Sequence, residues 1–479
     1  MSLKQKTVSG VVWSFAEALF LKGLSFITMI FLARWLGPID FGLMGMIAVF
    51  IGIGTSLVDS GMSSSLIRTK NADDSDFTTV FYMNMAISLL VYALMFYAAP
   101  YISTFYGQVV LIDIIRIYCL VFIISAFSAV QMAILNKEMR FKRIMLLNAP
   151  SIIIGVSVGL FLGYNNYGVW SIVTMYMTTQ IILSLLLWIT GSWKPSLNFS
   201  REKLKFHYNF GYKIMLSGLL DVVFRNSYNI VIGKFFPVQT LGYFERAKRF
   251  NEYPSLTITT IVSKVTYPML AQLQDDTPKM SKVFRSLLQI AFFIIAPLML
   301  GLAAMAEPLF NLILGREWLA AVPYFQILSL AAMLFPIHAF NVNVLKVYGR
   351  SDLFLFLDVI KKSFLVLALI IGFQFGVIGM IWGSVFVSFF SLLINTHYSS
   401  KFINYSTKRQ LLDMLPILLL ACLTFLLMYY SVYFFVDYSE IVQIVFASII
   451  GISFYLLIHS FFKASPLYAL LTIIKNRKL

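Results

Sequence analysis

Long apolar stretches separated by short polar or basic gaps recur along almost the whole chain. A helix needs about 20 mostly apolar residues to cross the hydrocarbon core of a bilayer. The pattern therefore predicts fourteen transmembrane helices, of which the second, tenth and fourteenth have the least distinct ends. Their predicted ranges are 11–34, 40–61, 77–103, 112–136, 144–162, 167–190, 212–234, 252–273, 282–305, 322–345, 353–372, 375–396, 411–434 and 441–462.

The composition agrees with this pattern, since 59% of the residues are hydrophobic and 12% are charged, whereas soluble domains are about 25% charged. The formal net charge of +16 would suggest a nucleic-acid partner in a soluble protein, but here Lys and Arg gather in the gaps between apolar stretches. Cys119 and Cys422 each lie inside an apolar stretch, which argues against a disulfide framework or a thiolate metal site. We predict an all-α polytopic membrane protein that binds no nucleic acid and no metal.

The basic gaps also predict the orientation in the membrane. They follow even-numbered helices, as Arg140 follows the fourth, Lys203 the sixth and Arg409 the twelfth. Because cytoplasmic loops carry the excess of Lys and Arg, both termini are expected in the cytoplasm. One gap, 234–251, is basic although this scheme places it outside.

An internal repeat organises the first twelve helices. The matching positions are Pro38 and Pro237, Gly42 and Gly242, Pro100 and Pro308, Gly107 and Gly315, Leu135 and Leu345, Arg140 and Arg350, Gly168 and Gly379, and Trp170 and Trp382. The offset drifts only slowly along the chain, so we predict two six-helix lobes and two further helices. The predicted domains are a first lobe (1–190), a cytoplasmic linker (191–211), a second lobe (212–400) and a C-terminal helix pair with a basic tail (401–479).

Six helices per repeat keep both copies in the same orientation, as in transporters that bind substrate between their halves and alternate access. The first helix of each copy carries charge within its apolar stretch. In the second copy Asp221 and Arg225 are four residues apart and share a helix face, which Ser217 and Asn229 would extend. Charges at membrane depth cost about 3 kcal/mol each on insertion scales. This face therefore forms either a structural ion pair between helices or the wall of a water-filled cavity.

Several runs of residues resemble a known family. They are RWLGPIDFG (34–42), SGMSSSLI (60–67), NIVIGKFF (229–236), LGYFERAKR (241–249), YPMLAQLQDD (267–276) and AEPLFNLILGREW (306–318). Together they resemble the Wzx-type polysaccharide flippases of the multidrug/oligosaccharidyl-lipid/polysaccharide (MOP) superfamily, those of the colanic acid type in particular.

The resemblance implies a flippase that moves an undecaprenyl-diphosphate-linked oligosaccharide across the bacterial inner membrane for O-antigen, capsule or exopolysaccharide synthesis. It also implies two lobes around a basic cavity, two extra C-terminal helices, no bound cofactor, and coupling to a proton or sodium gradient. A polysaccharide polymerase and assembly proteins are candidate partners.

Several polar and basic residues lie within the apolar stretches, where a lipid-linked oligosaccharide would have to pass. A diphosphate in a low-dielectric layer needs fixed cations, and sugar hydroxyls need amide, hydroxyl or imidazole partners. The candidate substrate-binding residues are Lys22, Arg225, Asn229, Lys264, His338 and Asn341. Lys264 shares a helix face with Thr257, Thr260 and Tyr267. Each candidate also has a structural alternative, since Lys22 can extend its ammonium to the interface and a lone His is usually a packing residue.

Coupling to an ion gradient needs a carboxylate that changes its occupancy, and Glu17 and Asp221 are the two candidates within the apolar stretches. Arg225 would hold Asp221 ionised. Glu17 lies about 140° around the helix from Lys22 and cannot pair with it there. We therefore favour Glu17 as the ion-coupling residue.

Other classes of protein fit less well. An ATP-driven pump would need a GxxxxGK[ST] loop, which is absent from the sequence. An O-antigen polymerase or ligase would need a catalytic loop outside the membrane, and the predicted outer loops are short. A small-molecule drug antiporter of the same superfamily remains the alternative transporter, and its cavity would be more acidic. We therefore expect a transporter and not an enzyme.

Overall fold

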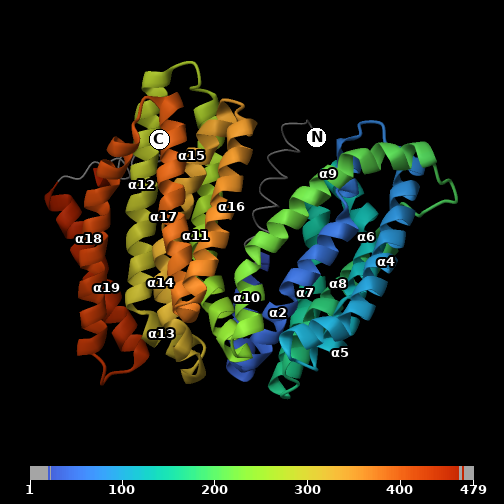
Figure 1. Ribbon diagram of the computed structural model, residues 1–479, viewed down its shortest axis with the longest axis horizontal. Coiled ribbons are helices and arrows are strands. Elements are labelled where there is room, and N and C mark those ends of the chain that lie inside the picture. The colour runs from blue at the N-terminus through green and yellow to red at the C-terminus, as the bar shows by residue number, and fades with distance from the viewer. Residues whose placement is uncertain (1–19, 22, 463–465, 469–479) are drawn as a thin grey trace. The chain divides into compact units, whose positions relative to one another are not determined.

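A computed structural model describes residues 20–21, 23–462 and 466–468, and every regular element in these ranges is a helix (Figure 1). The helices before residue 237 are α2 (Pro38–Asp59), α3 (Met62–Arg68), α4 (Asp74–Tyr106), α5 (Leu111–Tyr118), α6 (Leu120–Lys137), α7 (Phe141–Tyr164), α8 (Val169–Thr190), α9 (Arg201–Arg225) and α10 (Ser227–Phe235). They are followed by α11 (Val238–Ala271), α12 (Thr277–Ala304), α13 (Ala306–Ile313), η1 (Arg316–Ala321), α14 (Val322–Ala332), α15 (Phe335–Val347), α16 (Ser351–Phe373), α17 (Gly376–Ile403), α18 (Thr407–Phe434) and α19 (Glu440–Phe461).

Ten helical stretches among the described residues are long and apolar enough to cross a membrane. Three further helices, α9, α11 and α16, coincide with predicted spans but carry more charged side chains. The apolar helix Gly23–Trp35 lies in the first predicted span, of which residues 11–19 and 22 are outside the described residues. The all-α polytopic prediction is confirmed, and the number fourteen stays a prediction.

Local sequence explains where several helices begin and break. Asp73 caps α4, since its side chain accepts from the Asp76 N–H at 3.0 Å and the Asp76 side chain accepts from the Asp73 N–H at 3.0 Å. The predicted span 212–234 is broken between α9 and α10 at Asn226, whose Nδ2 donates to the Val222 carbonyl at 2.8 Å. A side chain that bonds the backbone in this way competes with the helix.

The chain folds as two compact units, Met1–Gly242 and Tyr243–Leu479. The sequence repeat had placed the first domain boundary near 190 and the start of the second lobe at 212. In the structure α9 and α10 instead pack within the first unit, against α2, α3 and α4. These two units are defined by contacts, and the predicted division by sequence repeat stays a prediction.

Equivalent turns of the repeat have the same backbone structure. The Arg140 N–H donates to the Leu135 carbonyl at 2.9 Å, and the Arg350 N–H donates to the Leu345 carbonyl at 2.9 Å. These bonds close the helix-ending turn in which one residue adopts a left-handed conformation. That residue is Met139 (φ 57°) in the first unit and Gly349 (φ 66°) in the second.

Two repeat-related glycines let the starts of α2 and α11 touch within the first unit. A Cβ added at Gly42 would lie 2.2 Å from the Val238 carbonyl oxygen, and one added at Gly242 would lie 1.9 Å from that of Pro38. Each contact is the repeat partner of the other. Only glycine permits this backbone approach.

The second unit is held by large apolar side chains that are fully buried, among them Phe284, Phe292, Trp318 and Phe340. By contrast, α4, α18 and α19 expose rows of Leu, Ile and aromatic residues, such as Tyr101 (78% exposed) and Phe434 (79%). Apolar surface of this extent is unusual on a soluble monomer and is expected of helices that face lipid.

Candidate functional site

The predicted charge pair on α9 is present. The Arg225 Nη2 donates to the Asp221 Oδ2 at 2.6 Å, one helical turn away. Both side chains remain accessible, at 71% and 51% of their full exposure, and Ser217 on the same face is exposed as well. An accessible ion pair of this kind contributes at most about 1 kcal/mol to stability. The structural ion pair and the cavity wall both stay predictions for this face.

Asn229 does not continue that face. It follows the break at Asn226 and is 1% exposed, and its Nδ2 donates to the Gly45 carbonyl at 3.3 Å. Its Oδ1 has no hydrogen-bond partner among the described residues. The break thus turns Asn229 toward α2, so the accessible polar face of α9 is formed by Ser217, Asp221 and Arg225.

Lys264 lies on the exposed face of α11 in the second unit. Thr257, Thr260 and Tyr267 are exposed beside it, as the sequence predicted. Each threonine hydroxyl donates to a carbonyl of its own helix at 2.7 Å, which leaves its oxygen able to accept a bond from a sugar hydroxyl. This face combines one cation with several hydrogen-bonding groups.

His338 and Asn341 lie between α15 and α17 in the second unit. The His338 Nε2 is 3.1 Å from the Ser388 Oγ, and its Nδ1 is 3.4 Å from the Asn395 Nδ2. Asn341 is 0% exposed and donates to the Ile337 carbonyl, while its Oδ1 accepts from Ser399. The geometry favours packing for Asn341, and substrate contact by either residue stays a prediction.

Two candidates, Glu17 and Lys22, lie outside the described residues. The Glu17 coupling site and the Lys22 cation therefore also stay predictions. In the ranges that the structure describes, there is no group of three or more His, Cys, Asp or Glu side chains that could hold a metal ion.

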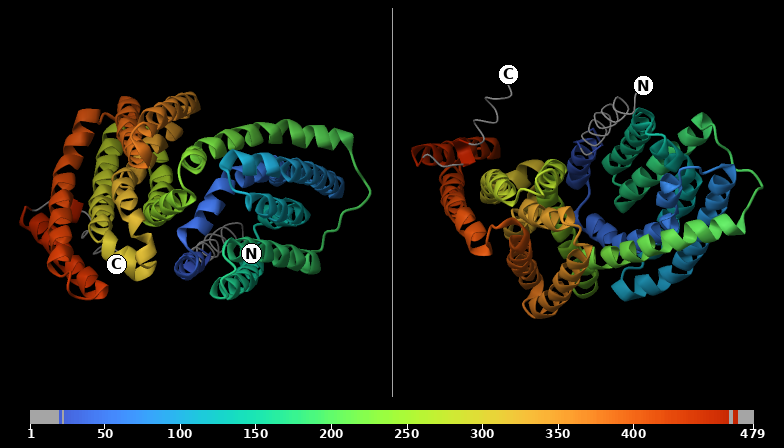
Figure 2. Two further views of the ribbon diagram at one scale, coloured as in Figure 1. Left: turned by 60° about the horizontal axis from the view of Figure 1, so that its bottom comes forward. Right: turned by 90° about the horizontal axis from the view of Figure 1, so that it is seen from above.

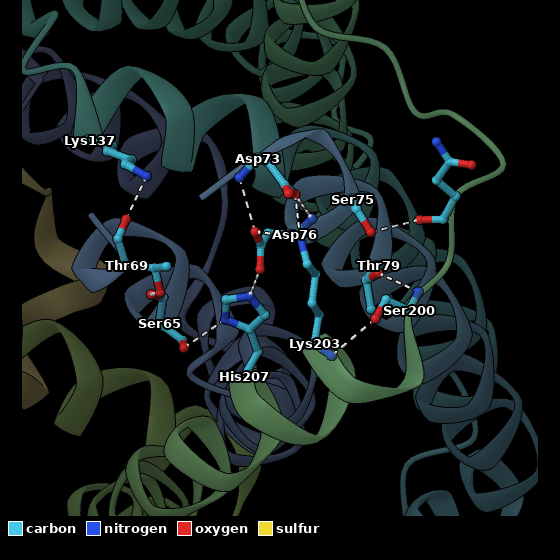
Figure 3. Close-up of polar contacts among 11 residues, drawn as sticks. Ser65, Thr69, Asp73, Ser75, Asp76, Thr79, Lys137, Ser200, Lys203 and His207 are labelled. Atoms are coloured by element: carbon cyan, nitrogen blue, oxygen red, sulfur yellow. Dashed lines mark hydrogen bonds and ion pairs between the residues drawn. The ribbon is translucent and has the colours of Figure 1, made fainter. Parts of the chain in front are cut away.

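The structure brings together a set of charged residues that the sequence had not singled out. We call Ser65, Asp73, Asp76, Lys203 and His207 the His207 cluster (Figure 3). The His207 Nδ1 is 2.8 Å from the Ser65 Oγ, and its Nε2 is 3.0 Å from the Asp76 Oδ1. The Lys203 Nζ donates to the Asp76 Oδ2 at 3.0 Å and also to the Asp73 carboxylate.

Burial is graded across the His207 cluster. The Asp73 and Lys203 side chains are 63% and 27% exposed, the Asp76 side chain 7% and the His207 side chain 0%. Hydrogen bonds to Lys203 and to the Asp76 N–H lower the pKa of Asp73 to about 2. Burial would lower the pKa of Lys203, but its bonds to Asp73 and Asp76 outweigh burial and raise it.

Small residues make the His207 cluster possible by letting α9 approach the end of α2. A Cβ at Gly211 would lie 2.3 Å from the Ser60 carbonyl oxygen, and one at Gly61 would lie 2.6 Å from that of Gly211. Figures 1 and 2 show α9 as a long bent helix along one side of the first unit. The buried residues of α9 are His207 and Gly211, which lie in its first half, whereas Ser217 and Arg225 lie further along the helix and are exposed.

One sequence signal could have pointed to this cluster. His207 follows four basic residues in the gap before the seventh predicted helix, and Asp76 lies in the acidic run DDSD at the start of α4. Charge complementarity between these two segments is visible in the sequence. Their pairing is not, because Asp76 and His207 are 131 residues apart.

Known proteins resemble this chain in sequence. Residues 31–323 match the family described as polysaccharide biosynthesis protein. The lipopolysaccharide biosynthesis protein WzxC of Escherichia coli (strain K12) is 24% identical over 413 residues, which span 86% of this chain and 84% of WzxC. The succinoglycan biosynthesis transport protein ExoT of Rhizobium meliloti (strain 1021) is 24% identical over 331 residues, or 69% of this chain and 67% of ExoT.

Solved structures resemble it in fold. The lipid II flippase MurJ, in an inward closed conformation, matches 95% of this chain and 98% of its own with a TM-score of 0.75 at 16% identity. An inward-facing multidrug transporter of the MATE family and MOP superfamily matches 79% of this chain and 96% of its own, with a TM-score of 0.60 at 18% identity. The fold is therefore that of these multi-pass membrane proteins.

Proposed function

Because the chain belongs to the polysaccharide biosynthesis protein family, we propose that it is a flippase for an undecaprenyl-diphosphate-linked oligosaccharide repeat unit. It moves this substrate across the bacterial inner membrane by alternating access, for O-antigen, capsule or exopolysaccharide synthesis. ExoT is a transport protein and MurJ a flippase by name. The chain is accordingly a polysaccharide biosynthesis transport protein and not an enzyme, as the sequence predicted.

The observation that carries the proposal is the accessible Asp221–Arg225 pair, which lies in a stretch otherwise apolar enough to cross a bilayer. A diphosphate brings negative charge into a layer where an unpaired ion is very costly. Arg225 offsets that charge and can grip two phosphate oxygens at once, since a guanidinium presents its donors in a fixed fork. Lys264, which is exposed on α11, is a second cation proposed to contact the substrate.

The remaining parts of the proposal follow from the sequence. Both termini are cytoplasmic, and fourteen helices cross the membrane. A proton or sodium gradient drives the cycle through Glu17 or Asp221. Lys22, Asn229, His338 and Asn341 complete the proposed substrate site, and a polysaccharide polymerase and assembly proteins receive the exported unit.

The test is complementation of a deletion strain that accumulates lipid-linked repeat units on the cytoplasmic face. We expect Arg225→Ala and Lys264→Ala to insert normally and to lose rescue, because each removes a cation that offsets the diphosphate. Arg225→Lys should rescue in part, since it keeps the charge but not the forked grip. Export is measured as periplasmic repeat units relative to the wild type.

Lys279→Ala is the matched control, because Lys279 is an exposed basic residue outside the predicted spans. It should rescue fully. Full rescue by both Arg225→Ala and Lys264→Ala would contradict the proposal. The deletion strain could instead lose resistance to cationic drugs and accumulate no lipid-linked repeat units. That outcome would favour the drug antiporter.

A further inference from the structure

His207 is an unusual residue to bury completely. It is 0% exposed, yet it lies where two carboxylates meet an ammonium group. An amide side chain could make the same two hydrogen bonds without carrying a titratable proton. Histidine is the side chain whose charge ordinarily changes within the physiological pH range. The proposed function makes no use of this residue.

The charges of the His207 cluster balance only when the histidine carries its proton. Asp73 and Asp76 each contribute one negative charge, and Lys203 contributes one positive charge. A neutral His207 leaves one negative charge in excess, and a protonated His207 removes it. Other charged groups nearby are Arg68 on α3, which stacks over Phe206 and Phe210, Lys137 on α6, which donates to the Thr69 carbonyl, Asp74 on α4, which accepts from Trp193, and the exposed Asp59 at the end of α2.

The hydrogen bonds accommodate both protonation states without movement of heavy atoms. In the neutral state the Nε2–H donates to Asp76 and the Ser65 hydroxyl donates to Nδ1. In the protonated state both ring N–H groups donate, and the Ser65 oxygen turns to accept. The proton can therefore be taken up or lost within one fixed set of contacts.

A hydrogen-bonded route connects this buried histidine to water. It runs from the exposed Asp73 through the partly exposed Lys203 to the buried Asp76 and then to His207. Exposure falls at every step along this route. By the predicted topology its open end faces the cytoplasm.

The same contacts fasten α9 to the rest of the first unit. His207 holds α9 to α3 through Ser65 and to α4 through Asp76, one turn before the close approach of Gly211 to Ser60. Arg225 lies at the far end of the same helix, about 27 Å further along. A change in the attachment of the first turns of α9 is therefore transmitted along a continuous helix to the Asp221–Arg225 pair.

We propose that His207 and Asp76 form a binding site for a coupling proton, which controls how firmly α9 is held against α3 and α4. The proton enters from the cytoplasmic side, binds at His207 and strengthens its bonds to Asp76 and Ser65. Its loss weakens these bonds, and the helix that carries Arg225 is then held less firmly in the same contacts. The coupling to transport rests on the proposed flippase function, whereas the proton-dependent attachment of α9 does not.

The attachment is tested by hydrogen–deuterium exchange of the purified full-length protein between pH 6 and pH 8, corrected for the intrinsic pH dependence of exchange. We expect the amides of the first turns of α9 and of α3 to exchange severalfold faster at pH 8 than at pH 6. His207→Gln keeps donor and acceptor groups but cannot take up a proton. In that variant the pH dependence should disappear.

His397→Gln is the matched control, because His397 is exposed on α17 in the second unit, and it should keep the wild-type pH dependence. Equal exchange at the two pH values in the wild type would overturn the proposal, whether or not the variants fold. A pH dependence that survives in His207→Gln would also overturn it.

The coupling is tested in proteoliposomes with repeat units extracted from the deletion strain. A pH gradient should accelerate flipping by the wild type and by His397→Gln but should not accelerate flipping by His207→Gln, each compared with its own rate without a gradient. Flipping by His207→Gln that still follows the gradient would refute the coupling. Neither the wild type nor any variant could move the substrate while hydrogen–deuterium exchange still depends on pH through His207. That outcome would contradict the flippase function and would still support the proton-binding site.

Discussion

At the scale of single residues, one protein uses paired charges in two different ways. Arg225 and Asp221 are bonded to each other and remain accessible, as the proposed contact between the guanidinium and a charged substrate requires. Asp76 and His207 are bonded and almost fully buried, so that they can report only the presence of a proton. Burial separates the two pairs, because a bound molecule can contact an accessible pair directly but cannot contact a fully buried one.

Asp73 makes a residue-scale prediction about acid stability. Its pKa is held at about 2 in the folded protein, below its ordinary value of 3.8, chiefly by the Lys203 ammonium. A lowered pKa stabilises the fold above the ordinary value, and this contribution is lost as the pH falls through 3.8 toward 2. Asn at this position still caps α4 but lacks the charge.

We therefore expect Asp73→Asn to melt at a lower temperature than the wild type at pH 6, and at the same temperature near pH 2. The measurement is thermal unfolding in detergent followed by circular dichroism across that range. Glu317→Gln, a change at an exposed carboxylate of the second unit, is the control. If the difference in melting temperature between the wild type and Asp73→Asn is the same at every pH, the stabilisation does not come from the lowered pKa of Asp73.

At the scale of elements, α9 carries both the Asp221–Arg225 pair and His207. The accessible charges lie near the end of α9, and Gly211, in its first half, lies directly against Ser60 and Gly61 between α2 and α3. Small residues let two backbones approach closely enough for dispersion and polar contacts to hold them. Such an interface is intolerant of added atoms.

Gly211→Ala tests this seating. Its Cβ would lie 2.3 Å from the Ser60 carbonyl oxygen, so the backbone must shift, at a cost of about 1–3 kcal/mol that exceeds the gain of about 1 kcal/mol in helix propensity. We expect a lower melting temperature and faster proteolysis near α9. Gly301→Ala, also in mid-helix, meets only the flexible end of Met428 at 3.3 Å and should be neutral or stabilising. Equal effects of the two variants would rule out a special role for the Gly211 contact.

At the scale of the whole molecule, the fold matches that of MurJ over nearly the full chain, although few residues are identical. A fold can persist while its sequence changes, as long as the apolar pattern and the close contacts are kept. Function then depends on which charges the helices present. In this chain the accessible face of α9 presents an arginine.

The predicted topology can be measured with reporters. Fusion of green fluorescent protein after Leu479 should fluoresce, and alkaline phosphatase fused after Asp437, between α18 and α19, should be active. The reason is the excess of Lys and Arg in the gaps assigned to the cytoplasm, including Lys475, Arg477 and Lys478 in the tail. The opposite pattern of reporter activity would invert the orientation and place the open end of the His207 cluster outside.

The sequence by itself determined the properties that depend on neighbouring residues. The apolar stretches predicted an all-α membrane protein, and six short runs of residues resembled the family. The spacing of four residues placed Asp221 beside Arg225, because the periodicity of a helix depends only on neighbouring residues. Only the tertiary structure decided that the Asn229 side chain turns toward α2, that α9 packs within the first unit, and that His207 contacts Asp76. These outcomes depend on contacts between residues far apart in the chain, and no local pattern specifies them.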